Sequence, residues 1–380
     1  LRVVRHRGGG TGVRGRPNLY TSYRSDGAIL PTSTQRVVFG AAIVAAILLP
    51  FAGLSRTWLI LLATTFVAAI GAIGLNLVTG YAGQISLGHA FFLGVGAYVG
   101  AALSGNPGTS VIGLGLDMLI WLPAAGLVAA LAGALVAPIA LRLRGLYLAL
   151  VTLGLVFLGE HILRNWDSLT GGTGIGRKPA VLSLLGWHFD QAGVIAGISL
   201  SREQQIYLLT FILLVVMAFA AKNLVRSRVG RAFSAIRDRD IAASVIGVDL
   251  TRYKVVAFAV SSFYAGVAGS LYFTVTGFVE PASFNLLLSI LFIAMVVIGG
   301  ASSIAGSIMG AAFVTLLPQI LDTASDWLPF LGGGGILSPA LLDRILFGGL
   351  IVVFLIFEPL GLYGIWIRVR NYWKAWPFSY

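Results

Sequence analysis

One long polar segment, Lys222 to Lys254, interrupts the second half of this very apolar chain. The segment holds eight Lys or Arg residues and three Asp residues. Residues 229–246 within it are predicted to form a short amphipathic helix. Its apolar face would consist of Phe233, Ile236, Ile241 and Val245. Between two membrane spans, such a helix either lies on the lipid surface or docks on a cytoplasmic protein.

Residues for bond-making chemistry are not arranged in any pattern typical of an enzyme. The sequence contains no Ser/His/Asp, paired-carboxylate or His-Glu-x-x-His arrangement, no cysteine and only four His. The Gly-rich stretch 171–178 lacks the order of a phosphate-binding loop, because Arg177 and Lys178 are followed by Pro179. We therefore expect neither an enzyme nor a cofactor bound by this chain. If the chain transports a solute, it is either a passive channel or is driven by another subunit.

Small and polar residues cluster at two predicted hairpins, around residues 74–97 and 298–312. Polar side chains between closely spaced glycines indicate a helix break whose free backbone groups line a pathway, since unwound backbone at membrane depth is tolerated only inside protein or along a cavity. A tight loop at the membrane surface is the alternative. The pathway candidates are Asn76, Gly80, Gly83, Gln84, Ser86, Gly88, His89, Gly299, Gly300, Ser302 and Ser303. Gly96–Gly100 and Gly306–Gly310 are GxxxG pairs suited to close helix contact.

The composition predicts an all-α polytopic membrane protein. The 380 residues are 57% hydrophobic and 11% charged, against about 25% charged in soluble domains. About ten apolar segments reach the roughly 20 residues that a membrane-spanning helix requires. We predict spans at 37–55, 57–78, 85–103, 118–141, 145–163, 204–222, 254–276, 285–303, 304–321 and 342–363. The Gly-rich hairpins would be broken or re-entrant.

The basic residues predict the orientation. Twenty of the 26 Lys and Arg residues fall in segments that are cytoplasmic if the N-terminus is inside, which places both termini in the cytoplasm. We therefore expect a disordered basic tail at 1–36, a transmembrane domain at 37–366 and a cytoplasmic tail at 367–380. A segment at 223–253 would be cytoplasmic and a loop at 164–203 external. The net charge of +12 does not indicate nucleic-acid binding, because the cations are not interleaved with stacking aromatics.

The small residues of the cytoplasmic helix favour docking on a protein. Ala242, Ala243 and Gly247 would allow the helix to enter a groove, and flanking charges would set its register. A helix on the lipid surface would carry more Trp, Phe or Leu residues.

Six ordered blocks resemble the permease subunits of branched-chain amino acid ABC importers, the LivM type more than the LivH type. They are GLNLVTGYAGQISLGHAFFLGVGAY (74–98), LRGLYLALVTLG (143–154), LTGGTGIG (169–176), AIRDRDIAASVIGVD (235–249), KVVAFAVSSFYAGVAGSLY (254–272) and MVVIGGASSIAGSIMGA (295–311). The similarity runs from about Leu59 to Phe357. The family's AAxxxG coupling motif corresponds to Ala242, Ala243 and Gly247. The family's acidic residue before the Ala pair is replaced by Ile241, with Asp240 one position earlier.

This resemblance implies a multi-pass permease in the bacterial cytoplasmic (inner) membrane. It would pair with a LivH-like permease, two cytoplasmic ABC ATPases that carry ATP and Mg, and an extracytoplasmic solute-binding protein. The solute would be branched-chain amino acids, or alternatively urea, short-chain amides or other amino acids; a passive channel or secondary carrier remains the other class. The expected ATPase contacts are Arg231, Arg237, Asp238, Asp240, Ala242, Ala243 and Gly247. The expected external docking residues are Gly171, Gly172, Thr173 and Gly174.

Overall fold

The computed structural model describes most of the chain as helices. The described residues are 33–106, 111–143, 145–172, 176–177, 182–184, 187–189, 193–195, 198–327, 345, 348–349, 352–353, 356–358 and 360–375. The longer helices are α2 (Ser33–Leu48), α3 (Arg56–Asn76), α4 (His89–Ser104), α5 (Met118–Arg142), α6 (Leu146–Arg164), α8 (Arg202–Arg226), α9 (Arg228–Val245), α10 (Leu250–Thr276), α11 (Leu286–Gly299), α12 (Ile304–Trp327) and α15 (Gly361–Ala375).

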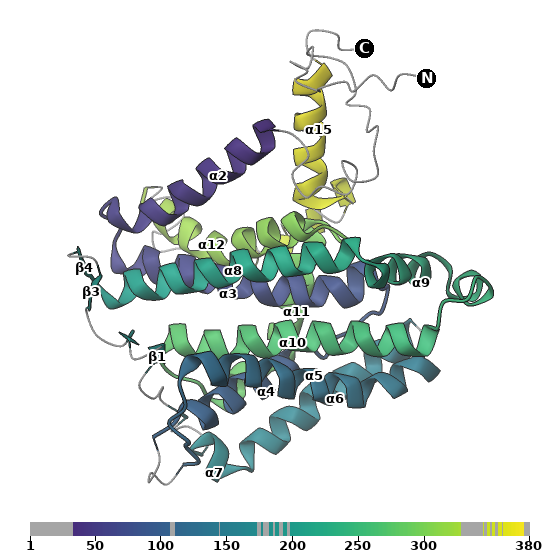
Figure 1. The fold of residues 1–380 in the computed structure, drawn as a ribbon, viewed down its shortest axis with the longest axis horizontal. Helices are drawn as coiled ribbons and strands as arrows, with labels where there is room; N and C mark the ends of the chain where they lie inside the picture. The colour runs from purple at the N-terminus through teal and green to yellow at the C-terminus, as the bar shows by residue number, and fades with distance from the viewer. Residues whose placement is uncertain are drawn as a thin grey trace, which may run out of the picture.

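Short elements connect these helices. They are the 3-10 turns η1 (Leu49–Phe51) and η3 (Pro281–Phe284), the π-helical turn η2 (Leu77–Tyr81) and the single turn α7 (Asp167–Thr170). Two small antiparallel hairpins pair β1 (Ser183–Leu184) with β2 (Trp187–His188), and β3 (Gly193–Ile195) with β4 (Ile198–Leu200). The α9 arm projects at one end of the bundle, and the β-hairpins lie at the other (Figure 1).

Five described helical segments are long and apolar enough to cross a membrane. They are Arg56–Tyr81, Met118–Ile139, Tyr147–Arg164, Arg202–Arg226 and Leu250–Thr276. Shorter apolar helices cover Arg36–Phe51, His89–Ser104, Leu286–Gly299 and Ile304–Ile320. The all-α polytopic class is therefore confirmed, and the first nine predicted spans each coincide with one of these helices. The count of ten is not confirmed, because ten of the 22 residues at 342–363 lie outside the described residues.

The predicted ends of the chain overlap described helices. Residues 1–32 of the expected N-terminal tail lie outside the described part, and α2 begins at Ser33. α15 runs across the boundary expected at residue 367.

Helices α3 and α10 form the centre of the bundle. α10 packs on α3, α4 and α5, while α3 also packs on α8 and α12. Both predicted GxxxG pairs lie at close helix contacts: a Cβ on Gly96 would stand 2.3 Å from the Gly266 Cα in α10, and one on Gly310 would stand 2.8 Å from the Gly299 Cα in α11. Glycine at these positions removes the side chain that would separate the helices.

Polar side chains cap the helices where the sequence changes from loop to apolar run. Asp249 accepts a hydrogen bond from the Arg252 amide at 3.0 Å at the start of α10. Ser201 and Gln204 form a reciprocal capping box at the start of α8. Such caps satisfy amide groups that have no partner within the helix, so they fix where a helix begins.

Candidate functional site

Asn76, at the end of α3, binds the turn between α11 and α12. Its side-chain amide is 1% exposed. Nδ2 donates to the Ser303 carbonyl at 2.9 Å and to Ser307 Oγ at 2.7 Å, while Oδ1 accepts from the Ser302 amide at 2.9 Å. One side chain thus joins the two hairpins that the sequence singled out separately.

Gly80 leaves room for this arrangement. It lies in η2, one turn beyond Asn76, and a Cβ at Gly80 would overlap the Asn76 amide and stand 2.6 Å from the Ser302 nitrogen. The π-helical turn carries a carbonyl group to the α11–α12 turn, where Ser302 Oγ donates to the Gly80 oxygen at 2.7 Å. π-Helical turns within α-helices occur frequently at functional sites.

Ser302 adopts a backbone conformation that is unusual for a residue with a side chain. Its φ of 62° is the only positive value among the described non-glycine residues. A left-handed non-glycine residue costs about 1–2 kcal/mol and persists when its surroundings hold it. Here the hydrogen bonds to Asn76 and Gly80 hold it. Gly300, two residues before Ser302, also has a positive φ, 114°. A Cβ at Gly300 would lie 2.7 Å from the Leu360 carbonyl oxygen.

Arg237 connects this junction to α9. Its Nη1 donates to Ser302 Oγ at 2.6 Å and to the Gly80 carbonyl at 3.3 Å. Its Nε and Nη2 each lie 3.0 Å from Asp238 Oδ1. Gly83, with φ of 68°, fits closely beneath it, because a Cβ at Gly83 would be 3.1 Å from the Arg237 Cα. The hydrogen-bonded set of Asn76, Gly80, Arg237, Ser302, Ser303 and Ser307 is called the Asn76 network below.

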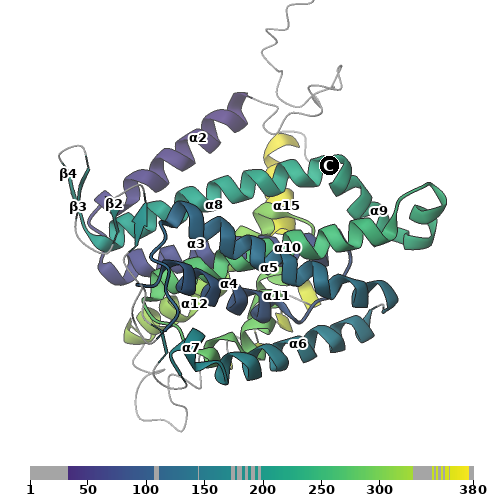
Figure 2. The same cartoon turned by 60° about the horizontal axis from the view of Figure 1, so that its bottom comes forward.

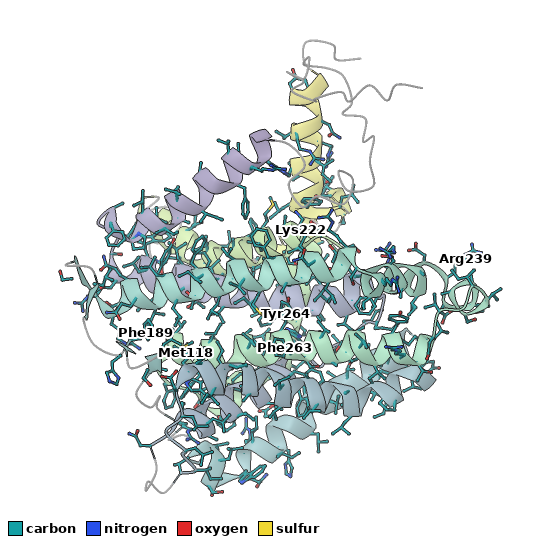
Figure 3. All side chains as sticks on the ribbon, viewed as in Figure 1. Met118, Phe189, Lys222, Arg239, Phe263 and Tyr264 are labelled. Atoms are coloured by element: carbon teal, nitrogen blue, oxygen red, sulfur yellow. The ribbon has the colours of Figure 1, made fainter. Side chains whose placement is uncertain are left out.

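The prediction of one continuous apolar face on α9 is wrong. The helix is broken at Arg239, whose φ of −158° and ψ of 103° are extended. Phe233 and Ile236, before the break, are buried, whereas Ile241 and Val245, after it, are 69% and 81% exposed. The break turns the second part of the helix, so its apolar residues face away from the bundle. Figure 3 shows Arg239 far out on the projecting arm.

The predicted ATPase contacts in the α9 tip, residues 241–247, differ in their exposure to solvent. Ala242 and Gly247 are exposed, as is Ile246 at 74%. Ala243 is 2% exposed, so it packs within this chain. Gly247 has φ of 89° and open space around its Cβ position. Arg231, nearer the bundle, is exposed, and Asp240, next to the break at Arg239, is half-buried.

The predicted break between η2 and α4 is a non-helical segment whose polar side chains are buried and which contacts α6 and α11. Gln84, Ser86 and His89 are each no more than 9% exposed. The Leu87 amide donates to Thr152 Oγ1, and the Ala90 amide donates to Ser289 Oγ, both at 2.9 Å. Thr152 and Ser289 satisfy backbone groups that the break leaves without helical partners.

Two further residues of this break lie against neighbouring helices. A Cβ at Gly88 would stand 3.0 Å from the Thr152 carbonyl oxygen. The His89 ring lies 5.0 Å from that of Phe292, and its Nε2 has no hydrogen-bond partner in the described part of the chain. A role for this segment in a pathway stays a prediction.

Sequence reasoning did not find Thr152, Ser289, Ser307 or the contact of Arg237. Each lies far along the chain from the groups it binds, and a hydroxyl on an apolar helix carries no signal of its partner. Asn76, by contrast, stands out as an amide in an apolar span, which indicates a buried polar contact.

At the opposite end, Arg177 binds three segments together. Its Nη1 donates to the Leu169 carbonyl at 2.8 Å, and Nη2 donates to the Ile112 carbonyl. Its backbone pairs with Val279 in an antiparallel bridge. Arg177 is 6% exposed, and burial lowers the pKa of its guanidinium from the usual value. The sequence alone placed Arg177 in the external loop and gave it no structural role.

Of the predicted docking residues, Gly171 and Gly172 lie close to Gly176, which directly precedes this arginine. Gly171 ends α7 with φ of 82°, and Gly172 follows with φ of 91°. Thr173 and Gly174 lie outside the described residues. Nearby, Glu160 and Arg164 form the ion pair that their spacing predicts, with Arg164 Nε 3.1 Å from Glu160 Oε1. Across the described ranges, no three His, Asp or Glu side chains gather as a metal site would require.

The sequence comparisons agree with this architecture. LivM of Salmonella typhimurium and of Escherichia coli, each named a high-affinity branched-chain amino acid transport system permease protein, are 32% identical to this chain over 345 residues, which cover 87% of this chain and 75% of each relative. The autoinducer 2 import system permease protein LsrC of Escherichia coli is 28% identical over 201 residues, covering 50% of this chain and 54% of the relative. No solved structure matches.

The family model described as "Branched-chain amino acid transport system / permease component" matches residues 57–355. This range contains both hairpins, the α9 arm and the Arg177 contacts. The chain therefore belongs to the permease components of the branched-chain amino acid transport systems.

Proposed function

We propose that this chain and a second, LivH-like permease form the pathway of an ATP-driven importer for branched-chain amino acids. Membership of the permease family and the LivM relatives support this solute. Two ABC ATPases on the cytoplasmic side would bind the ATP and Mg, because this chain has no phosphate-binding loop. A solute-binding protein would dock near Gly171–Gly174. The transporter would lie in the bacterial inner membrane with both termini in the cytoplasm.

The observation that carries the proposal is the position of Arg237. It lies on α9 between the exposed tip and the ends of the membrane helices, where it binds Gly80 and Ser302. A push or pull on the α9 arm would therefore reach α3, α11 and α12 through one guanidinium. This is the link that an importer driven by a separate ATPase requires, since coupling is carried by contiguous contacts between rigid elements.

The α9 tip is the proposed ATPase contact. Ile241, Val245 and Ile246 expose apolar surface on an otherwise polar arm, and clustered exposed apolar residues mark interaction sites. The flanking Arg231, Arg239 and Asp238 would steer the approach of the partner. Ala243 would support the tip from within the chain.

The test replaces both Val245 and Ile246 with Asp and measures two quantities in membranes that also contain the partner subunits. These are co-purification of the ATPases and ATP-dependent uptake of radiolabelled leucine. We expect both to fall at least about tenfold, because two charges would enter an apolar groove. The amount of permease in the membrane should stay unchanged, since these side chains are exposed.

Matched controls place Asp at Asn223 and at Thr251, which are exposed at the same end of the molecule but outside the tip. These variants should retain ATPases and uptake. Normal ATPase retention by the double tip variant would contradict the docking proposal.

A second candidate is import of a different solute by the same architecture. The similarity to LsrC over half of the chain supports this candidate, because that relative is named for autoinducer 2 import. Urea, short-chain amides and other amino acids belong to the same alternative. Vesicles supplied with ATP that retain the ATPases but take up no leucine, isoleucine or valine would contradict the proposed solute. The coupling proposal would be unaffected by that result. Uptake by this chain alone, without ATP, would instead indicate a passive channel or secondary carrier.

A further inference from the structure

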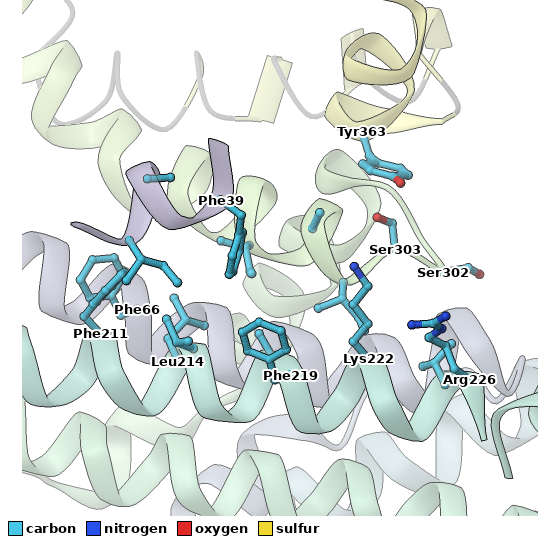
Figure 4. A pocket seen from close by; sticks show the side chains of 18 of the residues that line it. Phe39, Phe66, Phe211, Leu214, Phe219, Lys222, Arg226, Ser302, Ser303 and Tyr363 are labelled. Atoms are coloured by element: carbon cyan, nitrogen blue, oxygen red, sulfur yellow. The ribbon is translucent and has the colours of Figure 1, made fainter. Parts of the chain in front are cut away.

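A cavity of about 520 Å³ lies between α2, α8, the start of α12 and α15 (Figure 4). It is separate from the α9 tip, although Ser302 and Ser303 line one end of it. The long axis of its lining follows α8. The two ends of the cavity differ in chemistry.

One end of the cavity is apolar and aromatic. Phe39 from α2, Phe66 from α3 and Phe211, Leu214 and Phe219 from α8 line this end. None of these side chains offers a hydrogen bond. This end therefore suits hydrocarbon and not a polar solute.

The other end is cationic. Lys222 and Arg226 lie one helical turn apart on α8, and the hydroxyl groups of Ser302, Ser303 and Tyr363 lie at the same end (Figure 4). Among the residues that the structure describes, those lining the cavity include no Asp or Glu. Two cations beside the Ser303 and Tyr363 hydroxyls, with no carboxylate among the described lining residues, suit a phosphate group.

The spacing of these two ends matches half of a bilayer. Phe211 and Lys222 are eleven residues apart on α8, about 16 Å at 1.5 Å per residue. Half of the hydrocarbon core of a membrane is about 15 Å thick. A group held at Lys222 would therefore lie at headgroup level when Phe211 lies near the midplane.

The orientation of α15 is also consistent with headgroups at the depth of Lys222. α15 runs across the direction of α8 and α10, near the basic end of α8 (Figures 1 and 2). It exposes Trp366 and Tyr372 and also carries Arg368 and Arg370. Helices with exposed aromatic and basic residues lie in the membrane interface.

We propose that this cavity binds an anionic phospholipid, with its phosphate at Lys222 and Arg226 and one acyl chain along the phenylalanines. A free amino acid fits less well, since its ammonium group would find no carboxylate among the lining residues. A free phosphate would leave the aromatic end unfilled. Because Ser302 belongs to both the cavity and the Asn76 network, the bound lipid would contact the α11–α12 turn.

The test counts the phospholipids that remain bound to the full chain, extracted in detergent with any partners it retains, by native mass spectrometry after partial delipidation. We expect K222Q/R226Q to weaken retention of added phosphatidylglycerol by roughly tenfold or more, because each cation near an anionic lipid contributes to binding. Retention of phosphatidylcholine should change less than twofold. The control R228Q/R252Q removes the same charge from exposed positions outside the cavity and should behave as the unchanged chain.

A second pair of variants tests the acyl-chain end. A218W fills the cavity, whereas V216W places the same side chain on an exposed part of α8. Loss of bound phosphatidylglycerol in A218W but not in V216W supports the proposal. Equal retention in K222Q/R226Q and R228Q/R252Q, or in A218W and V216W, overturns it. Displacement of bound radiolabelled leucine by A218W with lipid retention unchanged also overturns it and assigns the cavity to the solute.

Discussion

Arginines at opposite ends of this molecule bind backbone carbonyls from distant segments, but they do so in different surroundings. Arg177, near α7, donates to the Leu169 and Ile112 carbonyls and is almost fully buried. Arg237, on α9, donates to the Gly80 carbonyl and Ser302 Oγ, and its side chain is 37% exposed.

The difference separates a fixed connection from a movable one. Removing the buried Arg177 would leave carbonyl groups without donors inside protein, so its contacts are expensive to break. Water can reach Arg237 and replace its contacts at small cost. The first arrangement suits an end of the molecule that keeps its shape. The second suits the joint between a driven arm and the membrane helices.

The largest expected effect on stability is that of Arg177→Met. Loss of two charge-assisted hydrogen bonds in a buried position should lower the free energy of unfolding by about 3–5 kcal/mol. The measurement is the thermal unfolding midpoint of the chain in detergent. Arg164→Met removes only an exposed ion pair at the same end and should cost less than about 1 kcal/mol. Equal shifts of the unfolding midpoint in the two variants would contradict the structural role of the buried Arg177 contacts.

Asn76→Leu should have the next largest effect. The substitution keeps similar volume but leaves the Ser302 amide, which holds a strained residue, without its acceptor. We expect a loss of about 1–3 kcal/mol in the free energy of unfolding, together with loss of transport. Asn223→Leu, on the exposed face of α8, is the control for the change of residue type. A stable and active Asn76→Leu chain would show that the Asn76 network is dispensable.

Gly83→Ala and Gly247→Ala compare the two ends of the α9 arm. Both positions have positive φ, so each alanine should cost about 1 kcal/mol in backbone strain. Gly83→Ala adds a contact 2.9 Å from Arg237 Cγ, whereas Gly247→Ala meets open space. The unfolding midpoint should therefore fall further for Gly83→Ala. The opposite order would mean that the tip is packed more tightly than the joint.

Arg237→Ala should have the smallest effect on stability and a large effect on transport. The free energy of unfolding should change by less than about 1 kcal/mol, because the guanidinium is partly solvated. ATP-dependent uptake should fall at least about tenfold while the ATPases remain bound, because the tip is intact but its link to Gly80 and Ser302 is lost. Arg228→Ala, at an exposed position at the start of the same helix, should transport normally. Normal uptake by Arg237→Ala would refute its role as the joint.

The helical architecture followed from the sequence because apolar length is a local property. Nine predicted spans coincide with described helices, and the glycine pairs at 96–100 and 306–310 lie where helices approach closely. The predicted continuous apolar face over residues 229–246 is wrong for a physical reason. A hydrophobic pattern reports the face of a regular helix, and the break at Arg239 turns that face partway along.

The composition of the candidate site was only partly visible in the sequence. Asn76, Gly80, Ser302 and Ser303 attract notice as polar or small residues within apolar spans. Their partners did not, because the Asn76 hydrogen bonds join positions more than 220 residues apart. No periodicity or motif links such distant positions in a single sequence.

The apolar helices, the basic arm and the family resemblance could be predicted from residue type and local spacing alone. Packing in three dimensions, in contrast, sets which glycine carbonyl meets which serine, and which arginine is buried. It also determines that Ala243 faces inward while Val245 faces outward. These depend on where helices separated in the chain come together, and packing, not local pattern, sets that position.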